Sequence, residues 1–205
     1  MHTVKVWDLP VRFFHWSLVV AFAVAFISGE NEAAIHEYAG YTVLGLVVFR
    51  IVYGFIGTQY ARFVNFIYSP REVFTYLRSL LNGRPQHYLG HNPAGGWMVM
   101  ALLLTLLIAG VSGWQHEREH ELEHARQHAV AGAAATVDDE HTSRNAADIN
   151  SHPQGHEESA WEEVHEVSVH VALILAIVHF LGVIASSYLH KEALVKAMIT
   201  GTKKR

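Results

Sequence analysis

Four histidines interrupt the most hydrophobic stretches of this sequence. His15 lies in VRFFHWSLVV, His36 opens IHEYAGYTVLGLVVF, and His165 and His179 lie in EVHEVSVHVALILAIVHFLG. A buried imidazole must satisfy its ring nitrogens by hydrogen bonds or by binding a metal. Because the chain has no cysteine, thiolate sites, iron–sulfur clusters and covalent haem attachment through CxxCH are excluded. Any metal or cofactor chemistry must therefore use imidazole.

The spacing within the last stretch puts two of its histidines on one helix face. His165 and His179 are fourteen residues apart, which on a helix leaves them within about 40° of each other and about 21 Å apart in depth. His170 is rotated by about 140° from His165 and is expected to point elsewhere. The residues of the same stripe are small and leave room for a flat group against the backbone: Ser168, Ala172, Ala176 and Gly182.

Four long apolar segments must position these histidines. Only 17% of the 205 residues are charged, against about a quarter in a soluble domain. A membrane-spanning helix needs about 20 mostly apolar residues, and four stretches qualify: about 11–29, 35–57, 93–114 and 164–189. The first lacks a signal-peptide cleavage site and is interpreted as a retained span. The sequence predicts an all-α integral membrane protein, a four-helix bundle that forms a single domain over residues 1–205.

The distribution of charge predicts the orientation of the bundle. Residues 58–92 hold four arginines against one acid, and the chain ends Lys-Lys-Arg. Residues 115–163 hold twelve acids against three arginines. By the positive-inside rule, both termini are expected in the cytoplasm, with a histidine-rich outer loop at about 115–163. The chain is expected to be a multi-pass membrane protein, in contact with lipid and not with nucleic acid.

Matching the depths of the histidines gives two pairs. The fourth span enters the membrane from the outside, so His165 is expected at the depth of His36. His179 is about four turns deeper, at the expected depth of His15. Each pair offers two imidazoles from facing helices at one depth, which is what a bis-histidine haem b needs. Two non-covalent haems stacked across the membrane are predicted.

One arginine lies inside the second span. Arg50 is fourteen residues after His36 and shares its face with Gly40 and Gly54. A charge at this depth is costly and should pair with an anion, so a propionate of the inner haem is the expected partner.

The cytoplasmic side carries helix signals. Ser69-Pro70-Arg71-Glu72 forms a capping box before an amphipathic stretch that Asn82-Gly83 ends, which predicts a short interfacial helix. The tail KEALVKAMITGTKKR is a candidate second interfacial helix. Asp8 and Asn92 are the expected caps of the first and third spans.

Several motifs together resemble a known family. WDLPVRFFHW, HEYAGY…FRIVYGFIG, GHNPAGG and VHE…HFLG…HKEALVKAMITG are similar to the prokaryotic cytochrome b561 family, and most like the cytochrome b subunits of nickel–iron hydrogenases. The resemblance implies a four-helix diheme cytochrome that passes electrons between a periplasmic redox partner, or hydrogenase-like subunits, and the quinone pool. It implies the haem ligands His15, His36, His165 and His179. It also implies a place in the bacterial inner membrane, with the loop at about 115–163 in the periplasm.

The implied exchange of electrons with quinone gives three candidate site residues at the cytoplasmic side, His91, His190 and Lys191. A quinone takes up protons on reduction, and histidine relays protons near neutral pH. The equally weighted alternatives are that His91 helps to cap the third span and that His190 contacts lipid headgroups.

The outer segment HEREHELEHARQH departs from what the resemblance leads us to expect. Its histidines recur every fourth residue at 116, 120, 124 and 128, and such a helical ridge could chelate zinc, copper or nickel. The favoured interpretation is a solvated helix that extends the third span. The segment after it is interpreted as a flexible linker.

The sequence favours a membrane electron-transfer subunit, and two rival functions remain. The first is a stand-alone superoxide:quinone oxidoreductase of the same family, against which the acidic outer loop weighs mildly. The second is a divalent-metal transporter or sensor built on the histidine-rich segment, although the spans carry few polar groups at the midplane.

Overall fold

Four long apolar helices make up most of the molecule. The computed structural model describes residues 3–29, 33–82, 88, 90–135, 160–190 and 193–204. The long helices are α1 (Leu9–Ser28), α2 (Ala33–Ile56), α4 (Pro93–Ala135) and α5 (Ala160–His190), and all four are long and apolar enough to cross a membrane. Short elements join them at one end: a 3₁₀ turn η1 (Phe63–Asn65), α3 (Pro70–Leu81), α6 (Leu194–Thr200) and the strands β1 (Thr3–Lys5) and β2 (Thr202–Lys204).

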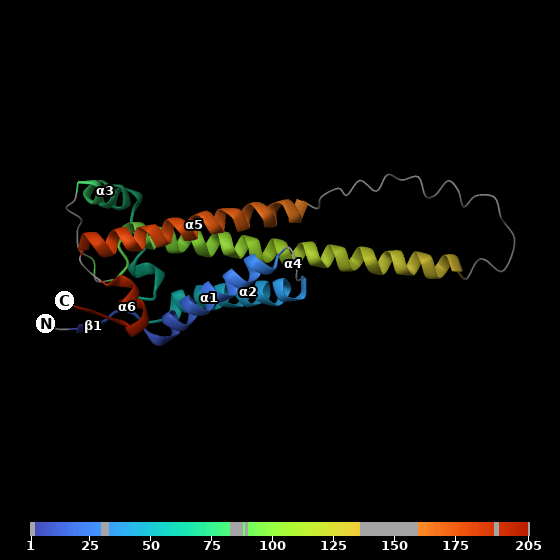
Figure 1. Ribbon diagram of the computed structural model, residues 1–205, viewed down its shortest axis with the longest axis horizontal. Helices are drawn as coiled ribbons and strands as arrows, with labels where there is room; N and C mark the ends of the chain where they lie inside the picture. The colour runs from blue at the N-terminus through green and yellow to red at the C-terminus, as the bar shows by residue number, and fades with distance from the viewer. Residues whose placement is uncertain are drawn as a thin grey trace.

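The helices pack as two antiparallel pairs. α1 lies against α2 and α4 against α5, while α2 contacts α4 and joins the pairs (Figure 1). Among the described residues, α5 makes no comparable close packing with α1 or α2. The core lies where the pairs meet, and it contains Phe14, Val43, Val47, Phe63, Phe66, Leu103, Leu106 and Ala172. The large apolar side chains that remain exposed on all four spans form the surface that lipid is expected to cover.

The third apolar helix continues well beyond the predicted span. α4 does not end near residue 114 but runs unbroken to Ala135, and α5 begins at Ala160. The interpretation of the histidine ridge as a helix that extends the third span is confirmed, whereas the bounds of the span within the membrane and of the outer loop at about 115–163 stay predictions. The residues after Trp114 are mostly glutamate, arginine, glutamine, alanine and leucine, which favour the helix, so nothing stops it there. Residues 136–159, which make up most of the predicted linker, lie outside the described residues.

Side chains cap the starts of α1, α3 and α4 at the positions that the sequence predicts. Asp8 caps α1 by accepting a hydrogen bond from the backbone N–H of Val11. Ser69 and Glu72 form the capping box of α3. The Asn92 side chain caps α4 through the N–H of Gly95 at 2.7 Å.

A two-stranded ribbon that the sequence did not predict joins the two ends of the chain. β1 and β2 pair antiparallel, with Val4 opposite Lys203. The expected interfacial helix in the tail covers only α6, because Gly201 adopts a φ of 81° that ends it. The N–H groups of Val6 and Trp7 both donate to the Gly201 carbonyl, at 2.9 and 3.1 Å. We call this end of the bundle the terminal end (Figure 1).

Candidate functional site

One pair of imidazoles lies toward the end of the bundle opposite the termini. The ring centres of His36 on α2 and His165 on α5 are 5.9 Å apart, with an interplanar angle of 84°. The Nδ1 atom of His36 lies 2.8 Å from the Ala25 carbonyl on α1, and that of His165 lies 2.8 Å from the Ala109 carbonyl on α4. Because a carbonyl only accepts, each Nδ1 carries the hydrogen. Each Nε2 is then left with a free lone pair, as a metal ligand requires.

Two glycines that the sequence analysis missed leave the space that these rings occupy. A Cβ atom at Gly29 would lie 3.4 Å from Nδ1 of His36, and one at Gly113 would lie 2.9 Å from Nδ1 of His165. One turn along α2 from His36, a Cβ at Gly40 would meet nothing within 4 Å. The surroundings are therefore tight against the Nδ1 side of both rings and open beside Gly40.

A second pair lies toward the terminal end. The ring centres of His15 on α1 and His179 on α5 are 6.5 Å apart, and His15 also stacks edge-on against Trp16 at 5.2 Å. The Nδ1 atom of His15 is buried and has no hydrogen-bond partner among the described residues. An unsatisfied buried nitrogen is costly, so this ring fits a site that receives a further group.

Both pairs pass a test of fit for one metal ion between two imidazoles. Imidazoles that bind an ion from opposite sides, with metal–nitrogen bonds of about 2 Å, have ring centres about 6 Å apart. The two observed separations, 5.9 and 6.5 Å, bracket this value. His170 lies outside both pairs, since its exposed ring has Nδ1 2.8 Å from the Glu166 carbonyl of its own helix.

The small residues predicted to leave room beside the histidines divide into two groups. Ala172 is 1% exposed and belongs to the packed core, and Ser168 is also buried. Beside Gly182, by contrast, a Cβ would meet nothing within 4 Å. At Gly54 a Cβ would overlap the ring of Phe63. Gly54, which shares the face of Arg50 on α2, therefore makes room for an aromatic side chain.

Arg50 is the only arginine that the structure describes as buried. It is 2% exposed, and its guanidinium lies 5.0 Å from the ring centre of Phe63 and 5.9 Å from that of Phe66. Nη2 donates to the Ala61 carbonyl at 3.1 Å, whereas Nη1 is buried without a partner in the described part of the chain. A buried cationic nitrogen without a partner fits an anionic group such as a propionate.

The family comparison agrees with this donor set. The model of the prokaryotic cytochrome b561 family matches residues 6–201. The chain belongs to this family. It is therefore a membrane cytochrome of the haem b type, in keeping with its four candidate spans.

Two curated relatives align with nearly the whole cytochrome. Both are named "Probable Ni/Fe-hydrogenase B-type cytochrome subunit", and they come from Rhizobium leguminosarum bv. viciae and Bradyrhizobium diazoefficiens. Each is 22% identical to this chain and covers 98% of it, over 89% and 86% of the relative's own length. No solved structure gives a significant match.

At the terminal end of the cytochrome, Asp8 is the centre of a hydrogen-bond network, of which the sequence predicted only the helix cap. Oδ2 of Asp8 accepts hydrogen bonds from Tyr53 and Thr58, both at 2.6 Å. Partial burial raises the pKa of Asp8, but the hydrogen bonds from Thr58, Tyr53 and Val11 and the charge of Arg50 outweigh it, so the net pKa is below the usual value. Asp8 is therefore ionised at neutral pH and ties the start of α1 to the end of α2.

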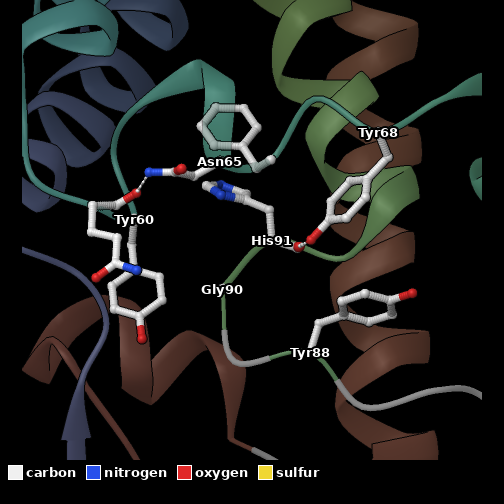
Figure 2. Close-up of a pocket in the computed structure, with 8 residues that line it drawn as sticks. Tyr60, Asn65, Tyr68, Tyr88, Gly90 and His91 are labelled. Carbon is white, nitrogen blue, oxygen red and sulfur yellow. Dashed lines mark hydrogen bonds between the residues drawn. The ribbon is translucent and has the colours of Figure 1, made fainter.

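A pocket of about 220 Å³ opens at the same end, beside His91. Its lining residues include Tyr60, Asn65, Tyr68, Tyr88 and His91, and Figure 2 shows the His91 ring directed toward Asn65 and away from Tyr88. The ring packs against Trp7 and Phe66, with centres 4.6 and 4.5 Å apart.

The protonation state of His91 differs from the one expected for a proton relay. Burial, with smaller contributions from the charges of Arg50, His179 and Lys203, lowers the pKa of His91 to about 3. The ring is therefore neutral at pH 7 and suits hydrogen bonding better than relaying protons.

The other two predicted quinone-site residues are not tested by the structure. His190 is the last residue of α5, and its side chain is not described. Lys191 lies outside the described residues.

The Asp8 network gives a prediction about stability. Replacing Asp8 with Ala should lower the free energy of unfolding by about 1 kcal/mol through loss of the cap, and further through loss of the bonds from Tyr53 and Thr58. Because the folded pKa is depressed, this contribution is present above the unfolded pKa of about 3.9 and is lost as pH falls through the folded pKa. Thermal unfolding in detergent should show a wild-type advantage at pH 7 that shrinks below about pH 4.

Asp8→Asn serves as the matched control, since asparagine keeps a capping oxygen but has no charge. At pH 7 the unfolding temperature of Asp8→Asn should lie between those of wild type and Asp8→Ala. Its stability should not show the loss in acid that protonation of Asp8 causes in wild type. Equal unfolding temperatures for wild type and Asp8→Ala at pH 7 would contradict the assignment.

Proposed function

We propose that this cytochrome carries two haems b, one held by His36 and His165 and the other by His15 and His179. The observation that carries the proposal is the presence of two imidazole pairs at two depths of one membrane bundle, with ring centres 5.9 and 6.5 Å apart. When bound, haem supplies reversible one-electron transfer between its ferric and ferrous states.

The protein's residues hold and tune the two sites. The Ala25 and Ala109 carbonyls fix the tautomer and orientation of His36 and His165 and make them stronger donors. The apolar residues of the core exclude water from the space between the sites. Arg50 offers its unpartnered Nη1 to a propionate of the haem at the terminal end.

We further propose that the chain moves electrons across the membrane between a periplasmic redox partner and the quinone pool. The charge distribution of the sequence supports a cytoplasmic terminal end, with the His36/His165 pair toward the periplasm. The names of the two relatives support a role as the membrane subunit of a nickel–iron hydrogenase. Hydrogenase subunits are then the periplasmic electron donor.

Quinone docks in the pocket beside His91 in this proposal. The pocket lies at the terminal end, and its tyrosines, asparagine and neutral imidazole can bond to quinone oxygens. The charges of Arg50 and His179 contribute to the lowered pKa of His91, which supports placing the pocket close to the His15/His179 site. The protons for quinone reduction then come from the aqueous side rather than from His91.

The two-haem proposal predicts which histidine variants lose cofactor. A pyridine haemochrome assay of purified wild type should give a b-type spectrum with about two haems per chain, one for each imidazole pair. His36→Ala or His165→Ala should remove one haem, and His15→Ala or His179→Ala the other. His170→Ala is the matched control and should retain both. A chain with one haem or none would refute the proposal, and a chain without any haem spectrum would favour the metal-transporter alternative.

Arg50 should act through its charge. Arg50→Met keeps the length of the side chain but removes the cation, which leaves the oxidised, more positive form of the nearby haem less opposed. The reduction potential of the His15/His179 haem should therefore fall, while that of the other haem stays unchanged. Redox titration followed by visible absorption measures both. An unchanged potential of the His15/His179 haem would show that Arg50 serves only its contacts within the protein, with the Ala61 carbonyl and the rings of Phe63 and Phe66.

The quinone pocket is tested by separating the two half-reactions. In His91→Ala, reduction of the haems by the periplasmic partner should survive, whereas their reoxidation by added quinone should slow. His190→Ala, at the end of α5, tests the other candidate in the same way. If neither variant slows reoxidation, quinone docks elsewhere.

A further inference from the structure

The extension of α4 carries a row of imidazoles that the electron-transfer proposal does not use. Beyond Trp114 the helix runs on past the start of α5 (Figure 1). Its side chains from Arg118 to Ala131 are exposed, and its histidines at 116, 120, 124 and 128 are one helical turn apart in sequence. The Nδ1 atom of His116, at the base of the extension, is buried without a hydrogen-bond partner among the described residues. The other three histidines, His120, His124 and His128, are exposed, so burial in the core does not account for them.

Two of these rings stand closer together than their neighbours. The ring centres of His120 and His124 are 4.5 Å apart with an interplanar angle of 75°, whereas those of His116 and His120 are 6.5 Å apart. Two imidazoles bound to one ion at about a right angle, with bonds of about 2 Å, have ring centres about 4.5 Å apart. The His120/His124 pair therefore already has the separation of a chelating pair.

The neighbouring charges favour a cation. Glu121 and Glu123 lie between the two histidines in sequence and in the exposed part of the helix, where carboxylates raise the local concentration of cations. Glu117 is engaged elsewhere, since it accepts a hydrogen bond from Tyr41 at 2.8 Å. This bond fixes the base of the extension to α2. No three potential ligands converge among the described residues. The two imidazoles are therefore the ligands from the protein, and water fills the remaining positions.

We propose that His120 and His124 form a surface site for a late first-row divalent transition metal, separate from both haem sites. Imidazole is a preferred ligand of Ni²⁺, Cu²⁺ and Zn²⁺. The i,i+4 spacing on a preformed helix supplies two such ligands without a change of backbone.

The test is a titration of the intact, haem-loaded protein with Ni²⁺. Protein in detergent is stripped of loosely bound metal with a chelator, and binding is followed by calorimetry. One Ni²⁺ per chain is expected to bind in wild type and in His128→Ala. His120→Ala/His124→Ala should weaken binding by about tenfold or more, because chelation is lost. Haem content should stay unchanged in every variant, which separates this site from the haem ligands.

A register control distinguishes a chelating pair from mere histidine content. His124→Ala/Leu122→His keeps the number of histidines but places the second imidazole two residues from His120, about 200° around the helix, and at an exposed position with no histidine three or four residues away, so it should lose binding as the double alanine variant does. Wild-type affinity in either double variant, equal loss in His128→Ala, or no binding by wild type would each overturn the proposal. In the last case the extension is a solvated helix only.

Discussion

An imidazole inside a hydrocarbon layer has no water to bond with, and the arrangement of this bundle follows from that constraint. His36 uses Nδ1 to bind a carbonyl of α1, and His165 uses Nδ1 to bind a carbonyl of α4. Each bond fixes the depth of one helix against its packing partner. Among the described residues, the close packing between the two helix pairs is that of α2 with α4. The contact of His36 with His165, whose ring centres are 5.9 Å apart, adds a second link, from α2 to α5.

The two imidazole pairs lie in different electrostatic surroundings. The His36/His165 pair is set by neutral carbonyls and by close glycines. The terminal end concentrates charge instead, with Arg50 buried among aromatic rings and Asp8 ionised nearby. Since the potential of a haem depends on burial and on neighbouring charge, sites with the same ligands need not have the same potential. A difference in potential between the two pairs would give electron flow a preferred direction.

The features that could be predicted from the sequence are those that depend on one helix at a time. Hydropathy gave the four spans, the Ser69 capping box gave α3, and a fourteen-residue spacing placed His165 and His179 on one face. The features that were missed depend on contacts between helices. No spacing along the chain reveals that Gly113 lies against His165, or that Gly54 makes room for Phe63. The ligand roles of the histidines stay a prediction.

The ribbon between β1 and β2 has a consequence for how the protein is assembled. The Trp7 ring that packs on His91 is held in place by backbone bonds to Gly201, and the Arg12 side chain reaches the Ile199 carbonyl, 187 residues away in the chain. These contacts cannot form until the residues around Gly201 have been synthesised. The packing of Trp7 on His91 can therefore be fixed only after α6 has folded, long after Trp7 itself has been synthesised.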